Sequence, residues 1–185
     1  MKDLRKMKFG LSILLSIAFM GCGARNVGKA YSLDETKGKG VAVVSLTRSG
    51  YRASSLFVHL RGVDNDYRKQ VPVTDLFASS DFGMGPLFGD IPADKPCGRL
   101  AVIELPQGEY EFYSFGGSNI WATTEFSMRF KVIAGQAVYL GNMHLSLQPR
   151  RYNIKTSDMC DRDLPLLYQK CPNIAPDTVV VNILR

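Results

Sequence analysis

Apolar and polar residues alternate along several stretches of the chain with the two-residue period of β-strands. The stretch Phe126–Val132 shows this most clearly, because every second residue is apolar and the residues between are Ser127, Arg129 and Lys131. Successive side chains of a strand point to opposite faces of a sheet. The pattern therefore predicts a strand with one buried face and one wet face.

The same criteria predict further strands, each separated from the next by residues typical of turns. Most are rich in β-branched and aromatic residues, which favour β-structure. Pro72 lacks a backbone N–H, so the strand that contains it is an edge strand or a bulged one. The predicted ranges are Val41–Thr47, Ser55–Arg61, Gln70–Thr74, Arg99–Leu105, Glu109–Phe115, Ala137–Leu147, Tyr152–Thr156 and Thr178–Leu184.

One segment near the C-terminus, Cys160–Cys171, favours a short helix instead. Asp161 and Asp163 are suitable N-cap residues, and Pro165 would fall in the first turn, where proline is tolerated. Together with the strands, this segment predicts an all-β protein. The expected fold is an antiparallel β-sandwich of about seven to eight strands with one short helix near the C-terminus.

The N-terminus has the composition of an export signal. Met1–Lys8 is basic, and Phe9–Met20 is predominantly apolar. This apolar run is shorter than the roughly 20 residues that a membrane-spanning helix requires. Residues 1–21 are therefore predicted to be a signal peptide.

The junction between Gly21 and Cys22 resembles the end of a bacterial lipoprotein signal, in which a small residue precedes the cysteine that becomes lipidated. Phe19 departs from the leucine that this class usually carries there. The resemblance implies that Cys22 is the acylated N-terminus and holds the protein to a membrane through several acyl chains, since one chain alone binds marginally. Gly23 follows, which in that class favours the periplasmic face of the outer membrane. The alternative is an unmodified cysteine in a signal that is cut after Ala24.

The chain beyond the signal divides into a tether and a domain. Residues 22–40 are polar, contain several glycines and show no periodicity, so they are interpreted as a flexible lipidated tether. Residues 41–185 hold all the predicted strands and form the β-sandwich domain. With 45% apolar residues, the chain has enough apolar surface for an ordinary core.

The net charge of +6 does not indicate a nucleic-acid-binding protein. Half of this excess belongs to the leader, which carries Lys2, Arg5, Lys6 and Lys8 against Asp3. What remains is too small and too dispersed for the clustered basic face that a nucleic acid requires. No nucleic-acid partner is predicted.

Two loops are candidates for binding. Phe77–Gly98 is dense in glycine and proline, so no regular element is predicted there, yet it contains Phe82, Leu87 and Phe88. These side chains either cover one end of the core or contact a partner. The only tryptophan, Trp121, lies in the second loop and is either a core residue or a platform for a partner. All four are therefore candidate partner-binding residues.

Three cysteines besides Cys22 lie in the exported part of the chain, where disulfides are permitted. Proximity in sequence favours a bond between Cys160 and Cys171. A straight helix over these positions would hold their Cα atoms about 16 Å apart, whereas a disulfide needs less than about 7 Å. Either the chain doubles back between the two residues, or Cys97 is a partner.

No arrangement of residues indicates a reactive centre. His59 and His144 each lie in the middle of a predicted strand, and no spacing brings a nucleophile, a base and an orienting acid together. The chain also lacks the motifs of phosphate, cofactor and metal sites, so no catalytic residue, cofactor or metal ligand is predicted. A periplasmic hydrolase that uses His59 or His144 remains an alternative.

The central part of the chain is similar to a family of uncharacterised bacterial lipoprotein domains of the transthyretin-like or carboxypeptidase-regulatory-like type. The similarity rests on an early strand that ends in arginine, Val41–Arg48, and on Leu105–Tyr110, where a strand leads into a Pro-x-Gly turn and aromatic residues. It also includes Ala134-Gly135 and Tyr139–Gly141. These are turn and core positions, so the resemblance implies an all-β domain and no activity.

The sequence thus predicts a membrane-anchored envelope lipoprotein that is not an enzyme. Its expected role is that of a binding or structural module. The lipid on Cys22 engages the membrane, and the partner is an envelope protein or a glycan. An accessory lipoprotein of a secretion or envelope-assembly apparatus is the alternative within the same class.

Overall fold

The computed structural model describes residues 25–50, 55–63, 74–80, 91, 98–117, 121–148 and 151–185. Several predictions lie outside this part of the chain. They are the signal peptide, lipidation of Cys22, any pairing of Cys97, and the binding residues Phe82, Leu87 and Phe88.

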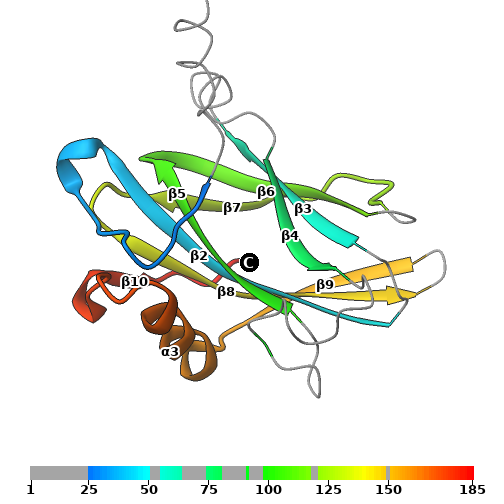
Figure 1. The fold of residues 1–185 in the computed structure, drawn as a ribbon. Helices are drawn as coiled ribbons and strands as arrows, with labels where there is room; N and C mark the ends of the chain where they lie inside the picture. The colour runs from blue at the N-terminus through cyan, green and yellow to red at the C-terminus, as the bar shows by residue number, and fades with distance from the viewer. Residues whose placement is uncertain are drawn as a thin grey trace, which may run out of the picture.

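The described strands form two sheets that pack face to face (Figure 1). In the first, which we call sheet A, the strand order is β1-β5-β2-β8-β10, and β9 pairs with the other half of β8. In the second, sheet B, the order is β4-β3-β6-β7. The bounds are β1 Arg25–Asn26, β2 Lys39–Gly50, β3 Ser55–Gly62, β4 Thr74–Ser80, β5 Gly98–Pro106, β6 Gly108–Gly117, β7 Met128–Val132, β8 Ala137–Gln148, β9 Arg151–Ser157 and β10 Val179–Val181.

This architecture confirms the all-β sandwich with a short helix near the C-terminus. The helix, α3, spans Cys160–Lys170 and covers the outer face of sheet A (Figure 1). Two short 3-10 turns, η1 (Glu35–Lys37) and η3 (Pro176–Thr178), complete the described elements. Sheet A differs from the expected antiparallel arrangement, because it is mixed: β8 pairs in parallel with both β2 and β10.

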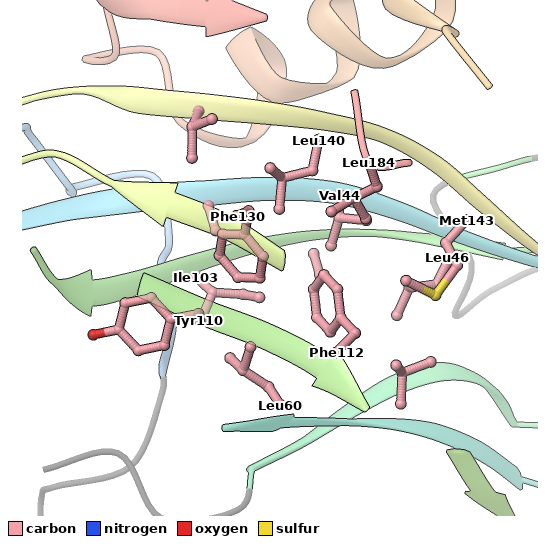
Figure 2. Packing of buried hydrophobic residues seen from close by; sticks show 14 of the residues in the cluster. Val44, Leu46, Leu60, Ile103, Tyr110, Phe112, Phe130, Leu140, Met143 and Leu184 are labelled. Carbon is pink, nitrogen blue, oxygen red and sulfur yellow. The ribbon is translucent and has the colours of Figure 1, made fainter. Parts of the chain in front are cut away.

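Two predicted strands differ in extent from the observed ones. Of the predicted strand Gln70–Thr74, only Thr74 lies within the described residues. It begins β4, which runs to Ser80, into the stretch for which no regular element was predicted, because pairing with β3 outweighs local composition. The closing strand β10 is shorter than expected. Beyond it the chain bends inward, and Leu184 is buried between the sheets (Figure 2).

The main core lies between the two sheets and uses the inward residues of the predicted alternation. Phe112 and Phe130 face each other across β6 and β7 with ring centroids 5.1 Å apart, and Tyr110 lies 5.8 Å from Phe130 (Figure 2). From sheet A, aliphatic side chains such as Leu46 and Ile103 complete the layer. Burial of each such side chain contributes about 1.5–3 kcal/mol.

A second core lies on the outer face of sheet A, beneath α3. Val43, Leu100 and Tyr139 meet Leu167 and Cys171 there. Because β2 is covered on both faces, its first half is a continuous apolar run, Val41–Val44, and does not alternate.

Residues 25–40 belong to the folded domain, so the prediction of a flexible tether over 22–40 is wrong for this part. β1 pairs with β5, the Val27 amide donates to the Val102 carbonyl at 2.8 Å, and Tyr31 packs on the second core. Burial and the neighbouring Glu104 raise the pKa of Tyr31 to about 12. The sequence of this segment shows no alternation of apolar and polar residues, because the segment covers the sheet with individual side chains and does not form a long strand.

The predicted disulfide between Cys160 and Cys171 does not form. Both residues are free thiols, at opposite ends of α3. An uninterrupted helix of this length keeps the two Cα atoms about 16 Å apart, too far for an S–S bond. The expected N-caps are also displaced, since the Asp158 side chain accepts from the Cys160 amide at 2.9 Å and Asp163 lies inside the helix.

Candidate functional site on the outer face of sheet B

The outer face of sheet B carries polar and aromatic side chains that the strand register places together. Arg61 of β3 lies opposite Glu111 of β6, and His59 lies opposite Ser114. The register shifts between these pairs, so Tyr113 is an extra residue on β6. Such a bulge re-aims a side chain, and here the Tyr113 ring lies on the outer face beside Arg61 and His59.

An ion-pair network fixes Arg61 in the middle of this face. Its Nε donates to Glu111 Oε1 at 2.7 Å, and its Nη2 donates to Glu125 Oε2 at 3.1 Å. The other carboxylate oxygen of Glu111 accepts from Ser127 Oγ at 2.7 Å. Burial raises the pKa of Glu111, but the bonds from Ser127 and Arg61 outweigh it and leave the pKa below its ordinary value. The carboxylate is therefore charged at neutral pH and holds the guanidinium in place.

Aromatic rings flank the guanidinium. The Arg61 guanidinium carbon lies 4.1 Å from the centre of the Tyr113 ring, a cation–π geometry. The His59 ring lies 5.9 Å from Tyr113 on the side toward the end of β6. These contacts hold two rings and one cation in a fixed arrangement.

Trp121 extends the same face and is 66% exposed. Its backbone forms a bridge with Gly116, next to the point where β6 ends. A Cβ placed on Gly116 would lie 3.1 Å from His59 Nε2, so position 116 faces the same side as His59. Because directly opposed residues share a face, the Trp121 indole lies on that side too. Trp121 is therefore a surface residue and not a core residue.

We call the set Arg61, Tyr113, His59, Trp121 and Glu125 the Trp121 surface. Sequence analysis identified only Trp121 and His59 in it. Glu111 and Tyr113 were visible as polar residues of a strand, but the pairing of Arg61 with Glu111 depends on a register that the sequence does not specify.

A second polar group, which we call the polar ladder, lies on the outer face of sheet A, which α3 also covers. Parallel pairing of β2 with β8 sets three polar pairs in a row: Ser45 with Asn142, Thr47 with His144, and Ser49 with Ser146. The first two β2 residues of the row are buried, and Ser49 is exposed.

Hydrogen bonds along the ladder fix the state of His144. Thr47 Oγ1 donates to Asn142 Oδ1 at 3.0 Å, so it accepts from His144 Nδ1 at 2.8 Å. His144 Nε2 is then the acceptor for the Ser49 hydroxyl at 2.9 Å. Burial, and then the charge of Lys155, lower the pKa of His144, which favours this neutral ring.

The buried end of the ladder holds a charged group. Asp163 of α3 is fully buried and accepts from Ser45 Oγ at 2.6 Å and from Tyr139 Oη at 2.7 Å. Arg162 Nε donates to its other oxygen at 2.7 Å. The arrangement fastens α3 to sheet A. The sequence did not indicate it, because Asp163 was expected at a helix cap.

The chemistry available to the ladder is limited. A serine hydroxyl on a neutral imidazole is the first contact of a hydrolytic site, but the second ring nitrogen of His144 bonds a threonine hydroxyl and not a carboxylate. Across the part of the chain that is described, no three His, Cys, Asp or Glu side chains gather where they would hold a metal ion. Of the two candidate histidines, His59 belongs to the Trp121 surface and His144 to the polar ladder.

The chain has no match among protein-family models, curated proteins or solved structures. None of the described helices has the length and apolar character needed to cross a membrane.

Proposed function

We propose that this protein is a lipid-anchored envelope module that binds a protein partner through the Trp121 surface. The anchor is the acylated Cys22, which Gly23 directs to the periplasmic face of the outer membrane. The domain is of the transthyretin-like lipoprotein type that its turn and core positions resemble. Binding, and not catalysis, is its activity.

The observation that carries this proposal is the exposure of Trp121 beside a fixed arginine and tyrosine. Tryptophan, tyrosine and arginine are the residues in which binding energy concentrates at protein interfaces. At 66% exposure, most of the apolar surface of this indole is in contact with water, and a partner would bury it. The ion pairs of Arg61 hold the surface in one conformation, which lowers the entropy cost of binding.

The position of the anchor supports the same function. β1 pairs with the last residues of β5, beside the turn that leads into β6 at Gly108. Trp121 lies next to Gly116, eight residues further along β6, which is roughly 26 Å at 3.3 Å per residue. With β1 beginning three residues after Cys22, the anchored end of the sandwich is close to the bilayer and the Trp121 surface is directed away from it.

Replacement of Cys22 tests the anchor. In the native host, Cys22→Ser should release the protein from the membrane fraction and stop it from running at its mature, processed mass. A serine variant that still fractionates with membranes and is processed normally would contradict lipidation.

Replacement of Trp121 tests the binding surface. Trp121→Ala should abolish co-purification of the partner from cross-linked cells while leaving the melting temperature unchanged. Ile133→Ala is the matched control, because Ile133 is also an exposed large apolar residue, at 47%, but lies at the other end of the sandwich. A partner that is retained equally by both variants would contradict the proposal. If the cross-linked partner is a glycan and not a protein, the class of partner differs from the one proposed. If it is a component of a secretion apparatus, the module is an accessory lipoprotein of that apparatus.

The Ser49–His144 contact favours a second candidate, a periplasmic hydrolase that uses His144 as the base for Ser49. A fluorophosphonate probe that labels the wild-type protein but not Ser49→Ala or His144→Ala would support it. Absence of labelling in the wild type would exclude a reactive serine at this place.

A further inference from the structure

The open side of the sandwich, where β7 and β10 end their sheets, contains a groove. Its volume is about 660 Å³, and it is lined by Ser127, Arg129, Val181, Asn182, Ile183 and Arg185. It lies between β7, the edge strand of sheet B, and β10, the edge strand of sheet A, together with the residues that follow β10. No residue of the Trp121 surface lines it, although Ser127 also donates to Glu111, the partner of Arg61.

The outer edge of β10 has backbone groups that point into solvent. β10 runs parallel to β8, and the Asn182 amide donates to the Tyr139 carbonyl at 2.8 Å. Amides of a strand alternate between its two sides, so Val180 and Asn182 face β8 whereas Val181 faces away from the sheet. An added strand would therefore find a donor and an acceptor at Val181.

β10 is only three residues long, and this shortness is itself a protection of natural edge strands. It carries none of the other protections, which are lysine, proline or a bulge, because it consists of three valines. Val180 and Val181 are 45% and 50% exposed. Burial of these side chains by an incoming strand would add apolar contacts to the main-chain bonds.

The positive charge of the groove favours a ligand with acidic groups. Arg129 and Arg185 bring two guanidinium groups, Ser127 and Asn182 are neutral, and none of the six lining residues is acidic. Arg129 also lies opposite Glu111 across β6 and β7, so its charge is partly compensated by that carboxylate, whereas Arg185 has no such neighbour among the lining residues. Guanidinium groups pair well with carboxylates. A second copy of this chain would bring an equally basic groove to the same place, which like-charge repulsion disfavours.

We propose that an extended peptide segment with acidic side chains binds along the outer edge of β10, adds a strand to sheet A, and places its carboxylates against Arg129 and Arg185. Strand addition of this kind takes affinity from main-chain hydrogen bonds and selectivity from alternate side chains.

The substitution Val181→Pro tests the main-chain part of the proposal. Proline removes the N–H that faces outward and leaves the bonds of Val180 and Asn182 to β8 in place, so the domain should keep its circular dichroism spectrum. Arg129→Gln with Arg185→Gln tests the charge part without altering the backbone. Trp121→Ala is the control variant.

The probe is a fluorescent peptide of about six residues in which valine and glutamate alternate, and its counterpart carries lysine in place of glutamate. Fluorescence anisotropy should show binding of the glutamate peptide by the wild type and by Trp121→Ala. Val181→Pro and the double arginine variant should each weaken this binding at least about fivefold, and the lysine peptide should not bind.

Three results would overturn the proposal. They are no binding by the wild type, equal binding by the wild type and the double arginine variant, and unchanged binding by a folded Val181→Pro. If Val181→Pro is unfolded, Val181→Lys replaces it, since a lysine on the edge strand also blocks strand addition. Self-association of the wild type in light scattering that Val181→Pro abolishes would assign the edge to a second copy instead.

Discussion

Individual residues show where polar groups are held and with what consequence. His144 is set between two hydroxyls by the parallel register of β2 and β8, and its neutral ring accepts from Ser49 and donates to Thr47. Arg61 is held in the same manner by two carboxylates and a ring. In both places, residues distant in sequence determine the orientation of the side chain.

The lowered pKa of His144 predicts a dependence of stability on pH. The unfolded state takes up the proton at the ordinary pKa of 6.5, whereas the folded state resists protonation to a lower pH. The stability contribution is therefore complete above the ordinary pKa and is lost as pH falls below it, toward the lowered value. In His144→Gln, the urea midpoint should fall less between about pH 7.5 and pH 5 than in the wild type. Equal slopes for the two proteins would show that His144 is not the group responsible.

At the scale of elements, the strands were largely predictable and the helix docking was not. Alternation of apolar and polar residues predicted β7, which contains Met128 and Phe130, and a run of β-branched residues predicted β2. Both patterns are local properties of the chain. The covering segment around Tyr31 and the buried partner of Asp163 depend on contacts between distant elements. No local pattern contains that information.

The contacts that hold α3 on sheet A predict that replacement of Asp163 lowers the stability of the domain. Its carboxylate is buried and bonded to Ser45, Tyr139 and Arg162, so Asp163→Ala leaves these donors without their acceptor. We expect the free energy of unfolding to fall by about 3–5 kcal/mol in urea denaturation. Asp161→Ala is the control, since Asp161 lies in the same first turn but is exposed, and it should change stability by less than about 0.5 kcal/mol. Similar losses for both variants would mean that the buried network does not hold the helix.

The free thiols of α3 give a second prediction at this scale. Burial, followed by Asp158, raises the pKa of Cys160 to about 11, and burial raises the pKa of Cys171. Both groups are therefore protonated at neutral pH and react slowly. Peptide mapping of the oxidised protein should find no bond between Cys160 and Cys171. Such a bond would require α3 to be unwound.

At the scale of the whole molecule, the sandwich separates three regions. The end that carries β1 adjoins the proposed anchor, the opposite end carries Trp121, and the open side carries the groove between β7 and β10. Sequence analysis predicts an anchor, which stays a prediction, and singles out Trp121, but it indicates neither the Trp121 surface nor the groove. Both are made of residues that only the register and the closure of the two sheets bring together.

With the proposed lipid anchor in a membrane, this arrangement would leave the Trp121 surface accessible to a partner. A photoreactive amino acid in place of Trp121, introduced in living cells of the native host, tests this most directly. The account predicts a discrete cross-linked protein adduct from position 121 and none from the same probe at position 133, at the opposite end. Absence of an adduct at position 121, or equal adducts at both positions, would contradict it.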